Sequence, residues 1–197
     1  ATATDMYNVA VGYEAGNAIT TGKNNTLVGA KAGDALTTGE LNVALGDTAL
    51  GADDVGNRTV AIGYAALQSQ NFSTSTISYN TAVGYGAGSS VSTGIENTIL
   101  GYEAGDAITT GIRNQCFGRG AGSALSDADY NVAIGTFALG ADTLGSKSTA
   151  VGNDALGSQN FTTATDTFNT AVGYDAGQNI TTGIQNTLIG SECGDAL

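Results

Sequence analysis

Apolar and polar positions recur along this chain with a short and almost constant period. Each repeat begins with a polar residue, continues with small or β-branched residues that include two apolar positions, and then reaches a glycine, as in the stretch NTAVG at residues 80–84. Eleven such units, the last incomplete, begin at Asn8, Asn25, Asn42, Thr59, Asn80, Asn97, Asn114, Asn131, Ser148, Asn169 and Asn186. Self-similarity of this kind is typical of a solenoid, in which each unit buries its apolar side against its neighbours.

The fifth residue of every unit is a glycine, and we expect these glycines to be structural. They are Gly12, Gly29, Gly46, Gly63, Gly84, Gly101, Gly118, Gly135, Gly152, Gly173 and Gly190. The spacing is 17 residues, with two 21-residue steps from Gly63 to Gly84 and from Gly152 to Gly173, so an 89-residue super-repeat of five units overlies the short one. We therefore predict one repeat domain over residues 1–197, as a fragment of a longer fibre.

The repeat predicts an all-β fold. Glycine recurs at positions five, nine and fifteen, where it would weaken a helix, and the apolar run is short and β-branched. We predict a parallel β-roll, or β-solenoid, of about eleven 17-residue rungs, with two short strands per unit and a rise of about 4.8 Å per rung. Position four is always Val, Leu, Ile or Phe and is predicted to fill the core. Position three is also apolar and should then face outward, toward parallel copies of the same chain.

Two further patterns indicate that the rungs stack in register. Opposite charges fall at equivalent positions of adjacent units, in the pairs Glu14 with Lys31, Lys23 with Glu40, and Glu96 with Arg113. Asparagine opens nine of the eleven units, and a stacked asparagine column can form hydrogen bonds along the rod. Some units exchange Gly at position nine for Leu and carry Asp or Gln at position twelve and Val, Leu or Phe at position fourteen, as in Leu50, Asp53 and Val55. We place positions nine, twelve and fourteen at or near the core edge.

Composition narrows the possible partners. Six Lys and Arg stand against 18 Asp and Glu, a net charge of −12, which disfavours nucleic acid. No apolar run approaches the length of a membrane span, so we expect no membrane insertion. The chain has no histidine, and Cys116 and Cys193 fall at apolar repeat positions as small core residues. We expect no metal site and no cofactor.

The two 21-residue units carry extra loops, which are candidate receptor-contact surfaces because binding residues often lie in loops on a rigid scaffold. The candidate residues of the first loop are Gln70, Asn71, Phe72, Ser73, Thr74, Ser75 and Thr76. Those of the second are Gln159, Asn160, Phe161, Thr162, Thr163, Thr165 and Asp166. Five rungs apart, the loops should emerge roughly 24 Å from each other on the same side. A tolerated insertion or a loop that interlocks subunits are the alternatives.

A candidate aromatic strip is formed by Tyr64, Tyr85 and Tyr102, at position six of three consecutive units. Such a strip could stack on sugar rings, but packing between rungs or at a subunit interface is the favoured interpretation.

The units NVAVG, NTLVG, NVALG, NTAVG and NVAIG resemble the head repeats of YadA-type trimeric autotransporter adhesins and the related NTAVGY repeats of phage tail and head fibres. The resemblance covers essentially the whole chain and implies a homotrimer of left-handed parallel β-rolls. The units here are longer than the usual head repeat, and the 21-residue insertions are a further departure from the family pattern.

These observations favour a structural and adhesive fibre segment of a virion, a tail or head fibre that contacts a host cell surface, without catalysis. Its partners would be two further copies of the chain, other fibre or particle proteins, and a host surface glycan or protein, in an extracellular location. The head domain of a bacterial trimeric adhesin on the cell surface is the alternative. An ice-binding solenoid is less favoured because Asp53-Asp54 and Asn71-Phe72 interrupt the recurring threonines. A polysaccharide depolymerase would need paired carboxylates in a cleft. The available carboxylates lie at turn-like positions of a convex rod without a pocket-forming insertion, and the one adjacent pair has no obvious neighbour that would shift its pKa: Asp53, Asp54, Asp127, Asp129 and Asp142.

Overall fold

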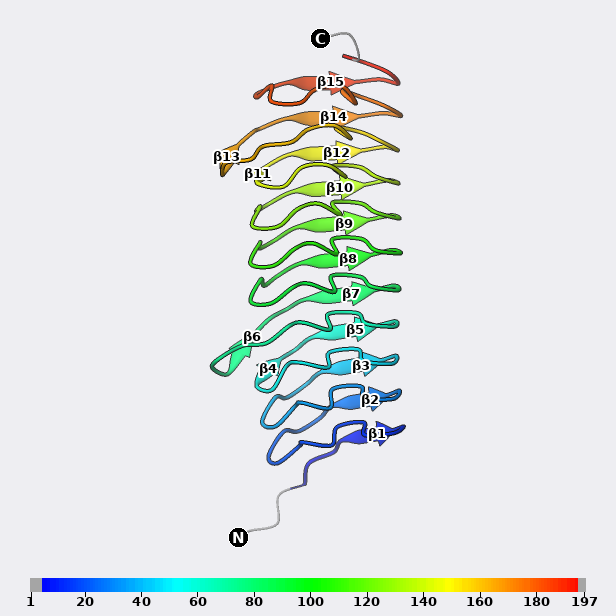
Figure 1. Cartoon of the computed structure of the whole chain (residues 1–197), viewed down its shortest axis with the longest axis vertical. Coiled ribbons are helices and arrows are strands. Elements are labelled where there is room, and N and C mark those ends of the chain that lie inside the picture. Colours follow the sequence, from blue (N-terminus) through cyan, green and yellow to red (C-terminus); the bar gives the residue numbers. More distant parts are fainter. Residues whose placement is uncertain (1–4, 195–197) are drawn as a thin grey trace.

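The computed structural model describes residues 5–194, which form a single rod of stacked rungs (Figure 1). One three-residue strand from each unit joins an 11-stranded sheet along the rod. In spatial order these strands are β1 (Val9–Val11), β2 (Thr26–Val28), β3 (Val43–Leu45), β5 (Val60–Ile62), β7 (Thr81–Val83), β8 (Thr98–Leu100), β9 (Gln115–Phe117), β10 (Val132–Ile134), β12 (Thr149–Val151), β14 (Thr170–Val172) and β15 (Thr187–Ile189). The first four and last three residues of the predicted domain lie outside the described part.

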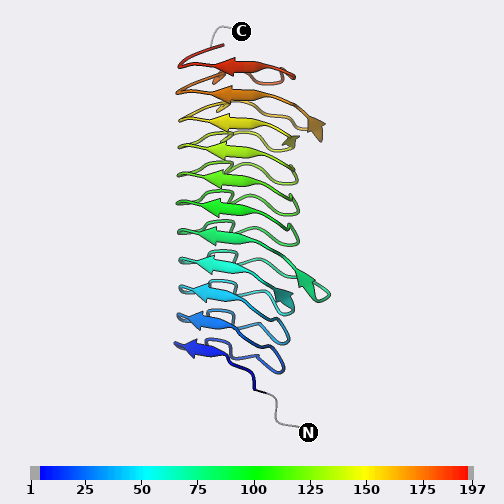
Figure 2. The same cartoon turned by 180° about the vertical axis from the view of Figure 1, so that it is seen from behind.

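All neighbouring strands of this sheet are parallel and in register. Ala10 pairs with Leu27, Leu27 with Ala44, and the same one-unit step continues to the pair of Ala171 with Leu188. The predicted parallel solenoid of about eleven turns, with equivalent positions stacked, is therefore confirmed. The view from behind shows the same even stack of rungs, with the two long loops projecting from one side (Figure 2).

The prediction of two strands per unit was wrong for most rungs. Among residues 5–194 a second strand occurs only beside the long loops, where β4 (Gly56–Asn57) pairs with β6 (Thr76–Ile77) and β11 (Gly145–Ser146) pairs with β13 (Thr165–Asp166). Elsewhere the return side of the rung consists of turns. The seventh residue of every unit has a φ between +50° and +63°, a left-handed conformation that interrupts an extended strand. The turns still bond to the next rung, for example through Gly16 N–H to the Ala32 carbonyl at 3.0 Å.

The core has the opposite parity from the one predicted. Position three points inward, with Leu27, Ile99 and Cys116 at 0–1% exposure, whereas position four points outward. Alternation along a strand shows only that positions three and four lie on opposite sides, and both are apolar here. Inside the roll position three packs against position nine, since a Cβ on Gly33 would lie 2.9 Å from Leu27 Cδ2. Each rung with Leu at nine has Ala at three, as in Leu50 with Ala44. Positions nine and twelve are therefore core positions, deeper than the predicted edge.

The predicted asparagine column is present and lies inside the roll. The Asn25 side chain donates from Nδ2 to the Gly39 carbonyl of its own unit at 2.9 Å, and its Oδ1 accepts a hydrogen bond from the Asn42 backbone N–H at 3.0 Å. Asn97 and Asn114 repeat this pattern. Each asparagine thus closes one rung and binds the next, which satisfies buried polar groups that would otherwise be costly.

Candidate contact surfaces

The outward face of the long sheet is an exposed apolar stripe that runs the length of the described rod. Position four supplies most of it, including Val11 at 57% exposure, Leu45 at 45% and Leu100 at 46%, and position two adds Val9 and other β-branched residues. Isolated apolar residues on a surface are ordinary, but a continuous row on one face of a sheet is typical of a surface that contacts another molecule. The predicted second apolar face therefore exists, although position four forms it in place of position three.

Both long loops project from the same side of the rod, as predicted, and lie at the ends of β6 and β13 (Figure 1). Their residues divide into two groups. Asn71, Ser73, Thr74 and Ser75 are exposed in the first loop, as are Asn160, Thr162, Thr163 and Asp166 in the second, while Thr76 and Thr165 are half-buried. Four residues predicted to contact a receptor lie inside the roll, namely Gln70, Phe72, Gln159 and Phe161. These four anchor the loops and cannot contact a partner directly.

A buried polar network holds the first loop. Gln70 donates from Nε2 to Asp53 Oδ2 at 2.7 Å and to Thr59 Oγ1 at 2.9 Å, and its Oε1 accepts from Asn80 Nδ2 at 2.8 Å. Asp53 also accepts from the Gly56 backbone N–H at 3.0 Å. Burial raises the pKa of the Asp53 carboxyl, and its hydrogen bonds with Gln70 and Gly56 oppose that change. As a candidate carboxylate, Asp53 was predicted to have no neighbour that would shift its pKa, and this prediction was wrong because the buried Gln70 and the Gly56 N–H both bond to it.

This network bridges a gap in the asparagine column. Thr59 replaces asparagine in the unit with the first insertion, so it offers no side-chain amide to the next rung. The inserted Ser78 takes over: its Oγ accepts from the Asn80 backbone N–H at 3.2 Å and lies 2.7 Å from Thr59 Oγ1. The second copy uses Asp142, Gln159, Ser148, Thr167 and Asn169 in the same roles. The four-residue insertion, the buried Asp and Gln, and the replacement of asparagine by Thr or Ser therefore belong to one structural arrangement. Their joint appearance in both copies of the 89-residue super-repeat is the sequence signal from which the buried network could have been predicted.

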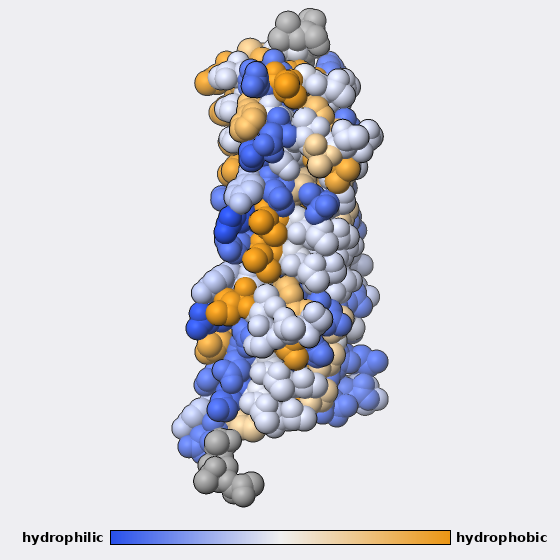
Figure 3. Space-filling model, turned by 90° about the vertical axis from the view of Figure 1, so that its left-hand side faces the viewer, coloured by the Kyte–Doolittle hydropathy of each residue, from blue (hydrophilic) through white to orange (hydrophobic). Residues whose placement is uncertain are grey.

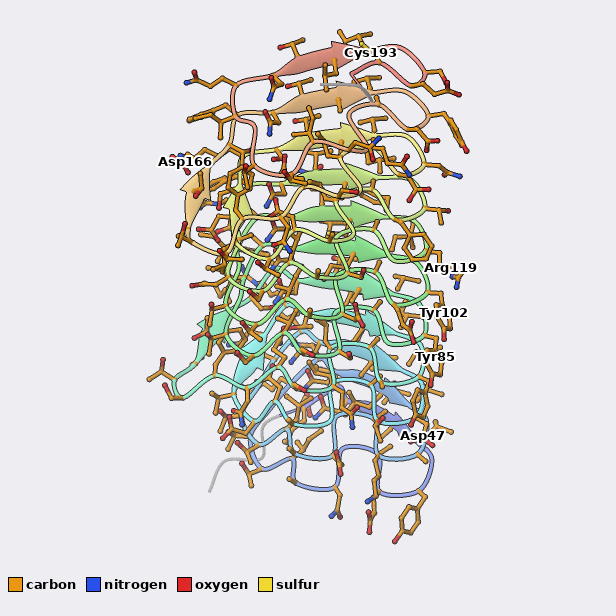
Figure 4. All side chains as sticks on the ribbon, turned by 45° about the horizontal axis from the view of Figure 1, so that its top comes forward. Asp47, Tyr85, Tyr102, Arg119, Asp166 and Cys193 are labelled. Atoms are coloured by element: carbon orange, nitrogen blue, oxygen red, sulfur yellow. The ribbon has the colours of Figure 1, made fainter. Side chains whose placement is uncertain are left out.

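The three predicted strip tyrosines stack on one another along the edge of the rod. The ring centroids of Tyr64 and Tyr85 are 5.0 Å apart with the planes inclined by 15°, and those of Tyr85 and Tyr102 are 5.3 Å apart at 9°. Figure 4 shows Tyr85 and Tyr102 between Asp47 and Arg119, at the edge opposite Asp166. Both faces of the Tyr85 ring, and the inner faces of the Tyr64 and Tyr102 rings, are covered by the neighbouring tyrosines. The geometry favours packing between rungs over sugar stacking.

A second column lies at the last position of each unit, and only its pair of Glu96 with Arg113 was predicted from the sequence. From Arg113 onward cations and aromatic rings alternate there, in the order Arg113, Tyr130, Lys147 and Phe168. Arg113 Nε lies 2.7 Å from Glu96 Oε2 below, its Nη1 donates to Tyr130 Oη above at 2.6 Å, and its guanidinium is 5.4 Å from the Tyr130 ring centroid. Lys147 lies over Phe168 and pairs with Asp166. Figure 3 views the rod from the side of β4, β6 and β13, where hydrophobic and hydrophilic side chains alternate along its length. Of the predicted charge pairs, Glu14 with Lys31 lies at 3.9 Å, and Lys23 with Glu40 is not in ion-pair contact.

The described residues contain no cluster of three or more His, Cys, Asp or Glu side chains that could hold a metal ion. Within the same range, no helix is present that could cross a membrane. Comparison with known proteins finds no matching protein-family model, no significantly similar curated protein and no significantly similar solved structure.

Proposed function

We propose that this chain is a structural and adhesive segment of a virion tail or head fibre, which assembles as a homotrimer and contacts a host cell surface without catalysis. The observation that carries the proposal is the outward apolar stripe of the 11-stranded sheet. Because the stripe follows every rung, the partner that best covers it is equally long and has the same rise per rung. A second and third copy of this chain, parallel and in register, meet that requirement. The repeat resemblance supports three copies and a left-handed winding.

The mechanism we propose is multivalency. A trimer would carry six long loops, and each exposed loop tip would make a weak contact with the host surface. Linked contacts bind together far more strongly than each alone, provided that the rod holds them in reach of the surface. The buried anchors Gln70 and Gln159 support this role because they fix the base of each loop while its tip stays exposed. The network residues of the loop base would then be positioning residues.

The first test is the molar mass of the purified chain, measured by light scattering over a dilution series. We expect about three times 19.5 kDa. Leu100→Arg places a charge in the middle of the apolar stripe and should yield monomers. Thr93→Arg, which alters an exposed turn residue on another side of the same region, should remain trimeric. A monomeric wild-type chain contradicts the assembly.

Host contact needs its own measurement, which is the binding of the fluorescently labelled chain to a panel of bacterial cells. Binding of the wild-type trimer should be lost in the Leu100→Arg monomer, since avidity disappears with assembly. A trimer that binds none of the cells contradicts the adhesive part of the proposal and leaves the assembly standing. A bacterial adhesin head would give the same results, and the sequence of the gene downstream of residue 197 separates the two origins: a heptad-repeat stalk and membrane anchor indicate the adhesin.

A further inference from the structure

A groove of about 440 Å³ lies at the base of the first long loop. Its lining combines three hydroxyl side chains, one amide, one carboxylate, one guanidinium and two aliphatic side chains: Thr21, Thr38, Ser75, Asn57, Glu40, Arg58, Leu41 and Ile77. They come from three successive turns and from β4 and β6. The volume lies in the range of small-molecule sites in proteins, which is about 300–1,000 Å³.

The groove is held in shape by its own hydrogen bonds. The Asn57 side chain accepts from the Glu40 backbone N–H at 2.8 Å and donates from Nδ2 to Ser75 Oγ at 3.0 Å and to the Thr76 carbonyl at 3.2 Å. Arg58 donates from Nη1 to Tyr79 Oη at 3.0 Å. The Asn57 amide therefore connects the third unit to the first long loop, and the hydrogen bond to Tyr79 holds the Arg58 guanidinium in place. A preorganised site of this kind loses little freedom when a ligand binds.

The super-repeat supplies an internal comparison. The residues 89 positions later are Thr110, Asp127, Asp129, Tyr130, Ser146, Lys147, Ala164 and Asp166. There the polar groups bond to one another: Thr110 donates to Asp127, Lys147 pairs with Asp166, and Asp129 accepts from the Ile112 backbone N–H at 2.8 Å. In the first copy Ile77 stands in place of Asp166 and Thr38 in place of Asp127, so Arg58 gains no carboxylate from the loop.

We infer that the groove of the first copy is a binding site for a neutral saccharide. Hydroxyls, an amide and one charge of each sign can donate to and accept from sugar hydroxyls, and Leu41 and Ile77 offer an apolar surface for the C–H face of a ring. Glu40 and the net charge of −12 oppose an anionic ligand. This inference rests on the proposed host-surface role and assigns that role a ligand class and a place.

The decisive variant transfers the paired arrangement of the second copy into the first. Ile77→Asp puts a carboxylate beside Arg58, as Asp166 is beside Lys147. The variant should fold, because Asp166 already occupies the equivalent register position of β13, opposite Ser146, as Ile77 lies opposite Asn57. The matched control is Thr93→Asp, which adds the same carboxylate at an exposed turn residue outside the groove.

The experiment is saturation-transfer NMR on the full chain with the methyl glycosides of glucose, galactose, mannose and N-acetylglucosamine at millimolar concentration, and with methyl glucuronide as the anionic probe. We expect at least one neutral glycoside to bind wild type and Thr93→Asp equally, and to bind Ile77→Asp roughly tenfold more weakly, a change of about 1.4 kcal/mol. No binding by any neutral glycoside, equal binding to Ile77→Asp, or binding of the glucuronide alone would each overturn the inference. If the chain is a trimer that binds cells but the groove binds no neutral glycoside, only this site is refuted. If the wild-type chain neither forms a trimer nor binds cells, the proposed function is refuted.

Discussion

Gly84→Ala tests whether the close approach of successive rungs requires the glycine at position five. Gly84 has a φ of +142°, and a Cβ atom built there would lie 2.2 Å from the carbonyl oxygen of Gly101 in the next rung. That oxygen would have to retreat by roughly 1 Å to reach an ordinary contact distance. The backbone bonds on either side, Gly84 N–H to Ile62 and Gly101 N–H to Val83, are 2.8 and 2.9 Å long and would be strained or broken.

The expected loss of stability is the sum of the backbone strain at this φ and the weakened hydrogen bonds. The backbone conformation of Ala at this φ costs about 1–3 kcal/mol, and one or two lost hydrogen bonds cost about 1 kcal/mol each. We therefore expect the free energy of unfolding to fall by about 2–5 kcal/mol. Gly86→Ala is the control in the same unit. Its φ is +63°, its Cβ would meet only Glu103 Cγ at 3.6 Å, and Ala65 already holds the equivalent position at +55°. Its cost should be about 1 kcal/mol.

The assay is guanidinium unfolding followed by circular dichroism, with all variants at one protein concentration because assembly makes stability depend on it. Equal destabilisation by the two alanine variants would refute the steric argument, since both add a Cβ at a positive φ and only Gly84 faces a carbonyl. A variant that loses assembly before it unfolds would appear as a lower molar mass in light scattering.

Three further predictions concern the core and its networks. Gln70→Leu removes the hydrogen bond that Asp53 Oδ2 accepts from Gln70 and the one that Asn80 Nδ2 donates to it, while Asp53 keeps its bond from the Gly56 N–H and Asn80 its bond to the Gly94 carbonyl. The free energy of unfolding should fall by about 2–4 kcal/mol, and protease should cut the first loop sooner than in the exposed control Asn71→Ala. Burial raises the pKa of the Asp53 carboxyl above 3.8, so the folded chain holds this proton to a higher pH than the unfolded chain does. The contribution of this carboxyl to the free energy of unfolding should therefore fall as pH rises from 3.8 through the folded pKa. Unfolding measured over a pH series should depend less on pH in Asp53→Asn, and the same pH dependence in variant and wild type would contradict this prediction. Burial raises the pKa of the Cys116 thiol to about 12, whereas Cys193 is only half-buried. In the native chain iodoacetamide should therefore modify Cys193 alone, as measured by mass spectrometry of the peptides. A Cys116 adduct formed without unfolding would show that the core opens.

The period of the sequence was sufficient to predict the stacked part of the architecture. Equivalent residues meet because every step is one unit, so the register of the strands, the asparagine column, the Glu96–Arg113 pair and the common side of the two loops all follow from counting. In-register stacking converts each sequence column into a spatial column. That is why the stacked tyrosines could be expected before their rings were placed.

The tertiary structure decided whatever depends on the path of the chain within one rung. Positions three and four are both apolar, so alternation alone could not show that Ala44 faces the core and Leu45 the outside. The turns on the return side of the rung decide which side of the strand is enclosed. Gln70 resembles a surface loop residue until the inserted Ser78 and the gap at Thr59 place it in the buried network. The open first groove depends on single differences between two copies of one fold, Ile77 against Asp166, whose consequence appears only when Arg58 and Lys147 are placed beside them. Periodicity specifies which residues stack, whereas packing within the rung specifies which side they face.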